Sequence, residues 1–187
     1  RMVENALGTY ALPLGIGQTL ALRRVQGRLA EVLGIYEGVA RNLDWLGSYP
    51  LATLAMLYAG TEALDRARAL LDEIAPDIEA LPRRDDWLIS ITELGLVCAA
   101  VGDAERGARV AALLEPYAGR HAVYPGPMFY AGPVEHALAG LAALAGRRAE
   151  AVAHYEEAIA QADALGAAPA RARALCDLGL LLLGARR

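Results

Sequence analysis

The sequence predicts an all-α protein in which antiparallel helical hairpins stack as a right-handed solenoid. Hydrophobic residues make up 56% of the chain and are mostly Ala and Leu. They recur at helical spacing, and a pattern of apolar helix, polar turn and second helix occurs three times. The 187 residues suit a single repeat domain over 1–187 that can bury a core. No β structure is required.

Helices are expected near 18–43, 50–60, 62–75, 86–101, 103–117, 133–145, 147–165 and 168–184. Several helix boundaries coincide with prolines, which begin or end helices: Pro50, Pro76, Pro82, Pro116, Pro133 and Pro169. The helices group into hairpins over 18–49, 50–82, 86–118 and 133–165, followed by a final helix over 168–184.

The repeat is visible in three stretches, 58–76, 99–119 and 142–162. A turn residue stands at the same place in each, and a small residue follows five positions later. The turn residues are Glu62, Gly102 and Gly146, and the small residues are Ala67, Gly107 and Ala151. Glycine adopts the left-handed conformation after a helix at little cost, and a small residue lets two helices approach closely. Because one such hairpin cannot bury its apolar face alone, stacking is expected.

A segment between 119 and 133 interrupts this pattern with prolines and aromatic residues. Long connections are usually functional or disordered, and this one is too apolar for disorder. Its rings either plug the repeat core or form a ligand-binding or partner-binding wall. The candidate contact residues here are Arg120, His121, Tyr124 and Tyr130, with Phe129 beside them.

A second candidate site lies at Arg83, Arg84 and Trp87, where a guanidinium beside an aromatic ring could hold an anion or stack on a ring. The alternative is that Trp87 packs between hairpins while the arginines are solvated. The carboxylates Asp85, Asp86 and Glu93 are interpreted as a helix start and a solvated face.

Catalytic and metal sites are not expected. His121, His136 and His154 lack the spacing of a helical zinc pair, and His154 is expected on an exposed face. Only Ser48 and Ser90 are available as serine nucleophiles, neither in a GxSxG elbow. The chain has no lysine, which excludes a Schiff-base or P-loop lysine within it. We therefore expect no enzyme activity, no cofactor and no metal.

Charge and cysteine content indicate the compartment. A net charge of −4 argues against direct nucleic-acid binding. The uncharged run over 5–22 contains Pro13 and several polar residues, so a soluble segment is favoured over a membrane helix. Cys98 and Cys176 both stand in apolar helical context and are interpreted as reduced core thiols. The expected localisation is cytoplasmic.

The third repeat resembles a tetratricopeptide repeat. Its match consists of the turn glycine Gly146, the small residue Ala151, the aromatic Tyr155 and the later Ala158. The turn spacings of 40 and 44 residues exceed the usual period of about 34, and the 119–133 segment accounts for part of the excess.

A wider resemblance covers roughly 18–184. The runs ALPRRDDWL (80–88), AAVGDAERGARVAALLEPYAGR (99–120) and GPVEHALAGLAALAGRRAEAVAHYEEAIAQADALGAAPARARALCDLGLLLLG (132–184) are similar to the carboxy-terminal repeat region of large bacterial signal-transducing ATPases. These regulators carry a P-loop ATPase module with a LuxR-type or an adenylate cyclase-like domain. The resemblance implies that the chain is part of a larger protein. Asp86 departs from the family pattern, where Asn often precedes the Trp.

The leading hypothesis is therefore a non-catalytic sensor arm that binds a protein partner, other domains of its own chain or a small-molecule effector. Binding would shift the attached ATPase between off and on states. The alternative is a stand-alone scaffold that forms a homo-oligomer through the apolar C-terminal helix, over 176–184. A small helical enzyme is the third hypothesis.

Overall fold

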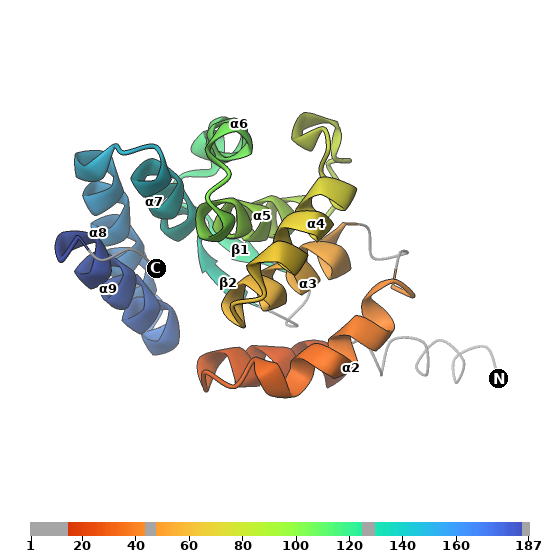
Figure 1. Ribbon diagram of the computed structural model, residues 1–187. Helices are drawn as coiled ribbons and strands as arrows, with labels where there is room; N and C mark the ends of the chain where they lie inside the picture. The colour runs from red at the N-terminus through yellow and green to blue at the C-terminus, as the bar shows by residue number, and fades with distance from the viewer. Residues whose placement is uncertain (1–14, 44–47, 125–129, 185–187) are drawn as a thin grey trace.

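The computed structural model describes residues 15–43, 48–124 and 130–184. These residues are predominantly helical, as the sequence predicts (Figure 1). A helix over 15–25 comes first. The α-helices that follow are α2 (Ala30–Ala40), α3 (Tyr49–Gly60), α4 (Leu64–Ile74), α5 (Trp87–Val101), α6 (Ala104–Leu114), α7 (Val134–Leu144), α8 (Arg148–Ala164) and α9 (Ala168–Leu182). Two short 3-10 turns, η2 (Ile78–Ala80) and η3 (Glu115–Tyr117), follow α4 and α6.

The helices pack in a regular order. Helix α3 packs against α4 and α5, α5 packs against α6 and α7, α7 packs against α8, and α8 packs against α9. Helices α3, α5 and α7 therefore form a row in which each helix is paired with the helix that follows it in the chain (Figure 1). Helix α8 lies at one end of this row together with α9.

The three turn positions of the repeat share one backbone conformation. Glu62, Gly102 and Gly146 have φ angles of 64°, 75° and 74°. Glu62 is the one described non-glycine residue with a positive φ. After the second turn, the carboxylate of Asp103 accepts a hydrogen bond from the amide of Arg106 at 3.0 Å and so caps α6. Each turn reverses the chain and sends the second helix back along the first.

The predicted small residues lie where helices approach each other. Ala67, Gly107 and Ala151 are all buried. A Cβ atom at Gly107 would lie 3.2 Å from a methyl of Leu141 and 3.1 Å from a methyl of Leu144, both on α7. The absence of a side chain at Gly107 thus sets the separation of α6 and α7.

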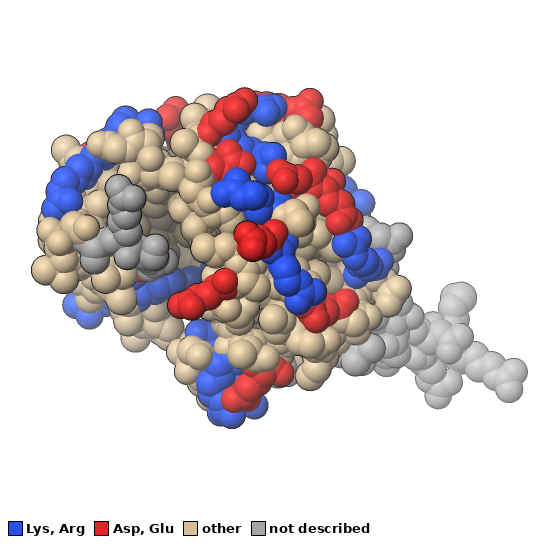
Figure 2. All heavy atoms as spheres, viewed as in Figure 1, with Lys and Arg blue, Asp and Glu red and all other residues tan. Residues whose placement is uncertain are grey.

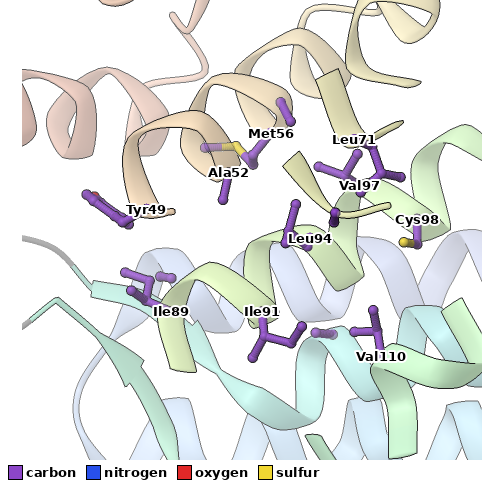
Figure 3. Close-up of a cluster of buried hydrophobic side chains, with 14 of the residues drawn as sticks. Tyr49, Ala52, Met56, Leu71, Ile89, Ile91, Leu94, Val97, Cys98 and Val110 are labelled. Carbon is purple, nitrogen blue, oxygen red and sulfur yellow. The ribbon is translucent and has the colours of Figure 1, made fainter. Parts of the chain in front are cut away.

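The core is centred on α5, which is buried around most of its circumference. Figure 3 shows side chains from α3, α4, α5 and α6 filling the space between these helices, with Ile91, Leu94 and Val97 at the centre. These three side chains are fully buried. A second, smaller cluster of Ala139, Tyr155, Ala158 and Ala174 joins α7, α8 and α9.

The expectation of a single helix over 18–43 is wrong, because this range forms parts of two helices. Gly27 has a φ of 69°, and the amide of Arg28 bonds to the carbonyl of Arg23 at 2.8 Å, closing the helix over 15–25. The chain then turns and continues as α2. Residues 44–47 of the first expected hairpin, 18–49, lie outside the described residues.

The expectation that no β structure occurs is also wrong. Strand β1 (His121–Val123) pairs antiparallel with β2 (Tyr130–Pro133), and a register shift lies between Ala122 and Val123. The pair packs against α5, α7 and α8. It borders residues 125–129, which lie outside the described residues. The candidate Phe129 and the prolines at 125 and 127 are among them.

The surface over α4 and α6 carries arginines and carboxylates in alternation (Figure 2). Arg41 bonds Glu73 through two nitrogens at 2.6 and 2.8 Å, and Arg106 bonds Asp72 at 2.9 Å. Arg109 bonds both Asp77 and Glu79. These pairs join consecutive hairpins on the outside of the row. Among the described residues, no helix combines the length and the apolarity needed to cross a bilayer.

Candidate functional site

The most deeply buried charged group is Glu93 of α5, which is fully buried. Its carboxylate accepts a hydrogen bond from the Thr53 hydroxyl of α3 at 2.6 Å. It also pairs with Arg24 of the helix over 15–25 at 3.2 Å. Burial raises the pKa of Glu93, while the charge of Arg24 and the bond from Thr53 oppose that increase. The expectation that Glu93 belongs to a solvated face is wrong, because its partners are brought to it by other helices.

Two tyrosines complete the surroundings of Thr53. Tyr36 of α2 and Tyr49 of α3 are both buried. Burial raises the pKa of each phenol, the negative charge of Glu93 adds to the increase, and a hydrogen bond with Thr53 opposes it. Both rings therefore stay neutral at physiological pH and can donate or accept hydrogen bonds.

The charge of Arg173 of α9 also acts on this cluster. Its positive charge lowers the pKa of Glu93 and of Tyr130, although burial is the larger effect on both and raises them. Arg173 is half-buried. Groups from the first helix, α3, α5, α9 and β2 are thus linked by contact or by charge, and we call them the inner cluster: Arg24, Thr53, Glu93, Tyr130 and Arg173.

The β pair brings two of the predicted site residues together and separates a third. The His121 ring nitrogen Nδ1 lies 3.1 Å from the Tyr130 hydroxyl, and the two rings are 5.8 Å apart. Tyr124 packs its ring at 4.6 Å from that of Tyr49, against the core. Tyr124 is thus placed as a plug would be, while His121 and Tyr130 are half-buried, and His121 contacts the inner cluster through Tyr130.

Arg120 is held by two hydrogen bonds of its backbone. Its carbonyl accepts a hydrogen bond from the amide of Val134 at 2.9 Å, and its own amide bonds to Tyr117 at 3.0 Å. The residue is exposed. These bonds fix the start of the β pair against the start of α7.

Trp87 is buried and lies under a guanidinium. The Arg83 guanidinium carbon is 4.2 Å from the Trp87 ring centre, and Arg83 donates to the Tyr117 hydroxyl at 3.0 Å. The Tyr117 and Trp87 rings are 5.4 Å apart. Arg83 rather than Arg84 therefore covers the indole, while Arg84 is exposed and its Nε lies 3.9 Å from the carboxylate of Asp86.

Asp86 has a second structural role that the sequence did not indicate. It is buried and accepts a hydrogen bond from the amide of Tyr49, the first residue of α3, at 3.2 Å. The Ser90 hydroxyl lies 3.3 Å from the same oxygen. Asp86 is the N-cap residue of α5, as its interpretation as a helix start predicts, and its carboxylate also caps the neighbouring α3. Asp85 is exposed as expected.

Two histidine–carboxylate pairs hold α7 to its neighbours. His136 Nε2 lies 2.7 Å from Asp177 of α9, and both side chains are buried. His154 of α8 bonds Glu135, whose other oxygen accepts the amide of Gly119 at 3.0 Å. His154 is therefore half-buried and paired, contrary to the expected exposed face.

The cysteines differ from each other. Burial raises the pKa of the Cys98 thiol to about 12, which makes it unreactive. Cys176 is exposed on α9, so its interpretation as a core thiol is wrong. Within the described ranges, no group of three or more histidine, cysteine or acidic side chains is arranged to hold a metal ion.

No family model, no curated protein and no solved structure matches this chain. The resemblance to tetratricopeptide repeats and to bacterial signal-transducing ATPases therefore depends on the quoted sequence runs alone and stays a prediction.

Proposed function

We propose that this chain is a non-catalytic binding domain of tetratricopeptide type, which serves as the sensor arm of a bacterial signal-transducing regulator. The row of α3, α5 and α7, each paired with the next helix, supports a stacked arrangement of hairpins. The shared turn conformation at Glu62, Gly102 and Gly146 supports a true repeat.

The observation that carries the proposal is the inner cluster. Glu93 of α5, Arg24 of the first helix and Arg173 of α9 come from segments far apart in the chain, and the positive charge of each arginine lowers the pKa of Glu93. Buried charge is costly to stability, so a fully buried carboxylate whose pKa responds to arginines of two distant helices favours a role in recognition for the residues around it. We propose that a metabolite, peptide or protein segment binds there, with Tyr130 and His121 at the edge.

The binding proposal is tested by thermal unfolding against a panel of amino acids, nucleotides, sugar phosphates and short peptides. At least one class is expected to raise the melting temperature of the wild type but not of Arg173→Ala or Tyr130→Ala. Arg171→Ala is the matched control, because Arg171 lies on the same helix and pairs with Asp163 at 2.7 Å. Equal shifts in all four proteins would remove the inner cluster from the proposal.

The regulator proposal is tested separately by the mass of the native polypeptide, measured by immunoblot of the source cells. A chain several times the 19.8 kDa of this segment is expected, and its ATP hydrolysis should respond to the compound found above. A native chain near 19.8 kDa would exclude an attached ATPase and leave the stand-alone scaffold as the better hypothesis.

A further inference from the structure

The carboxylate of Glu93 is positioned by two core helices, whereas the cation beside it comes from the helix over 15–25. Its Oε2 accepts a hydrogen bond from Thr53 of α3 at 2.6 Å, and α3 packs directly against α5. Its Oε1 lies 3.2 Å from a guanidinium nitrogen of Arg24. The Arg24 side chain is 8% exposed, so its guanidinium is almost completely enclosed. The structure therefore contains a buried carboxylate with a guanidinium bound to it.

Aromatic side chains lie beside this carboxylate and its cation. Burial is the main cause of the raised pKa of Tyr49, and the charges of Glu93 and Arg24 act on it in opposite directions. The Tyr49 ring lies 4.6 Å from the ring of Tyr124. Neutral aromatic rings and a carboxylate both attract an organic cation, above all where water is excluded. The surroundings of Glu93 thus suit a guanidinium whether or not it belongs to this chain.

The helix that supplies Arg24 is weakly built. Leu20 is the one buried residue among those of the helix over 15–25. Gly15 and Gly17 lower its stability, because glycine is a poor helix former. No described atom lies within 4 Å of a Cβ built at either glycine, so packing does not require them. A helix this short is marginal alone and depends on its tertiary contacts, the pair with Glu93 among them.

A glycine turn connects this helix to α2. Gly27 has a φ of 69° and is exposed. Rotation at this turn would withdraw Arg24 from Glu93 and leave α3 and α5 in place. Arg23 also ties the helix to Glu31 of α2 at 3.1 Å, but the two side chains are 26% and 46% exposed, and surface pairs of this kind contribute little.

We propose that Glu93 is the receptor for a guanidinium-bearing ligand, and that Arg24 occupies this receptor as an autoinhibitory contact when no ligand is bound. This inference rests on the proposed binding function and names the chemistry of the ligand. The incoming guanidinium replaces that of Arg24 and leaves the charge beside Glu93 unchanged, so the positive charge of Arg173 opposes both equally. Release of the helix over 15–25 is the conformational change that binding produces.

L-arginine and its neutral isostere L-citrulline test the ligand class on the 187-residue chain. Calorimetric titration should show L-arginine binding with a dissociation constant of about 1 mM, and L-citrulline should not bind. Glu93→Gln should abolish binding, because the amide keeps an oxygen for Thr53 and loses the negative charge.

A short peptide with one arginine, compared with the same peptide carrying citrulline, separates two sources of the guanidinium. Tighter binding of the arginine peptide than of L-arginine assigns the arginine side chain of a protein partner. Tighter binding of L-arginine assigns a free metabolite.

Variants of the first helix test the autoinhibitory contact. Arg24→Ala vacates the receptor and should tighten L-arginine binding by about tenfold or more. Gly17→Ala strengthens the helix and should weaken binding about two- to fivefold, which decides the question even where Arg24→Ala folds poorly. Gly179→Ala on α9 is the matched control, because its Cβ also meets nothing within 4 Å, and it should leave the affinity unchanged.

Hydrogen exchange reports the movement directly. The amides of residues 18–25 should exchange faster when L-arginine is added and should not respond to L-citrulline. The amides of α5 should become no less protected, because the receptor half of the site stays folded.

Four results would overturn the proposal. These are equal binding of L-citrulline, binding that persists in Glu93→Gln, binding that leaves exchange over 18–25 unchanged, and L-arginine that binds Arg24→Ala but not the wild type. Failure of the proposed function is seen separately. If L-arginine does not bind but another compound does, and Arg173→Ala and Tyr130→Ala abolish that binding, the binding function stands and this inference is wrong. If no compound binds, both are wrong.

Discussion

Glu62 adopts a backbone conformation that its side chain disfavours. Its φ of 64° matches those of Gly102 and Gly146 at the equivalent turns. A residue with a Cβ atom loses about 1–2 kcal/mol in the left-handed region relative to glycine, which adopts it freely. The turn between α3 and α4 is therefore strained, and the surrounding hairpin holds it in place.

Replacing Glu62 with glycine should relieve this strain. Glu62→Gly is expected to raise the free energy of unfolding by about 0.5–1 kcal/mol, after the larger chain entropy of glycine in the unfolded state is subtracted. Urea unfolding measures the change. Gly102→Glu is the reciprocal variant and should lower stability, although no atom lies within 4 Å of the added Cβ. Equal stabilities for wild type and Glu62→Gly would show that the turn carries no strain.

At the scale of elements, the contact between α6 and α7 depends on Gly107. A Cβ there would lie 3.1 Å from a methyl of Leu144 and 3.2 Å from a methyl of Leu141. The two methyls of a valine side chain would collide with these leucines. Gly107→Val is therefore expected to lower the free energy of unfolding by about 1–3 kcal/mol. Gly34→Val on α2 is the control, because its Cβ would meet nothing within 4 Å. The two variants have the same chemical change, so equal effects would refute the packing explanation.

Sequence reasoning predicted the helices and turns well where local signals decide them. The αL turns at Gly102 and Gly146 and the buried position of Gly107 follow from glycine and small-residue spacing. It missed the break at Gly27, because a single glycine in a helical pattern is often tolerated. The residues of β1 and β2 are also too few for a periodic signal.

The candidate site was predicted only in part, for a physical reason. His121 and Tyr130 meet, but Glu93 was assigned to solvent because its partner Arg24 lies 69 residues away in the chain. An ion pair between residues so far apart in the chain leaves no local pattern in the sequence. Glu93 in the otherwise uncharged run of α5 was the one available signal, since an acidic residue amid buried neighbours needs a partner.

At the scale of the whole molecule, the outer surface depends on charge pairs whose strength changes with pH. The Arg109 guanidinium beside Glu79 lowers the pKa of that carboxyl to about 2, and Arg41 lowers the pKa of Glu73. A carboxyl with a lowered pKa in the folded state stabilises the fold above its unfolded pKa of about 4.5, and this contribution is lost as the pH falls toward 2.

Removing Arg109 should weaken this dependence. For Arg109→Gln, the free energy of unfolding is expected to fall less steeply than in the wild type between pH 4.5 and about 2, because Glu79 returns toward its ordinary pKa. Urea unfolding at half-unit pH steps measures both slopes. In a Glu79→Gln background, adding Arg109→Gln should leave the slope nearly unchanged. Parallel curves for Arg109→Gln and wild type would contradict the pairing.

The small cluster of Ala139, Tyr155, Ala158 and Ala174 has a consequence for how such a chain can change over evolution. Three of its four members are alanines, and the large core around α5 contains no residue of α9. Duplication or deletion of helices at this end would therefore leave the main core intact. The same change between α4 and α7 would remove residues that hold the core together. The α9 end is thus where this architecture can gain or lose a hairpin and still fold.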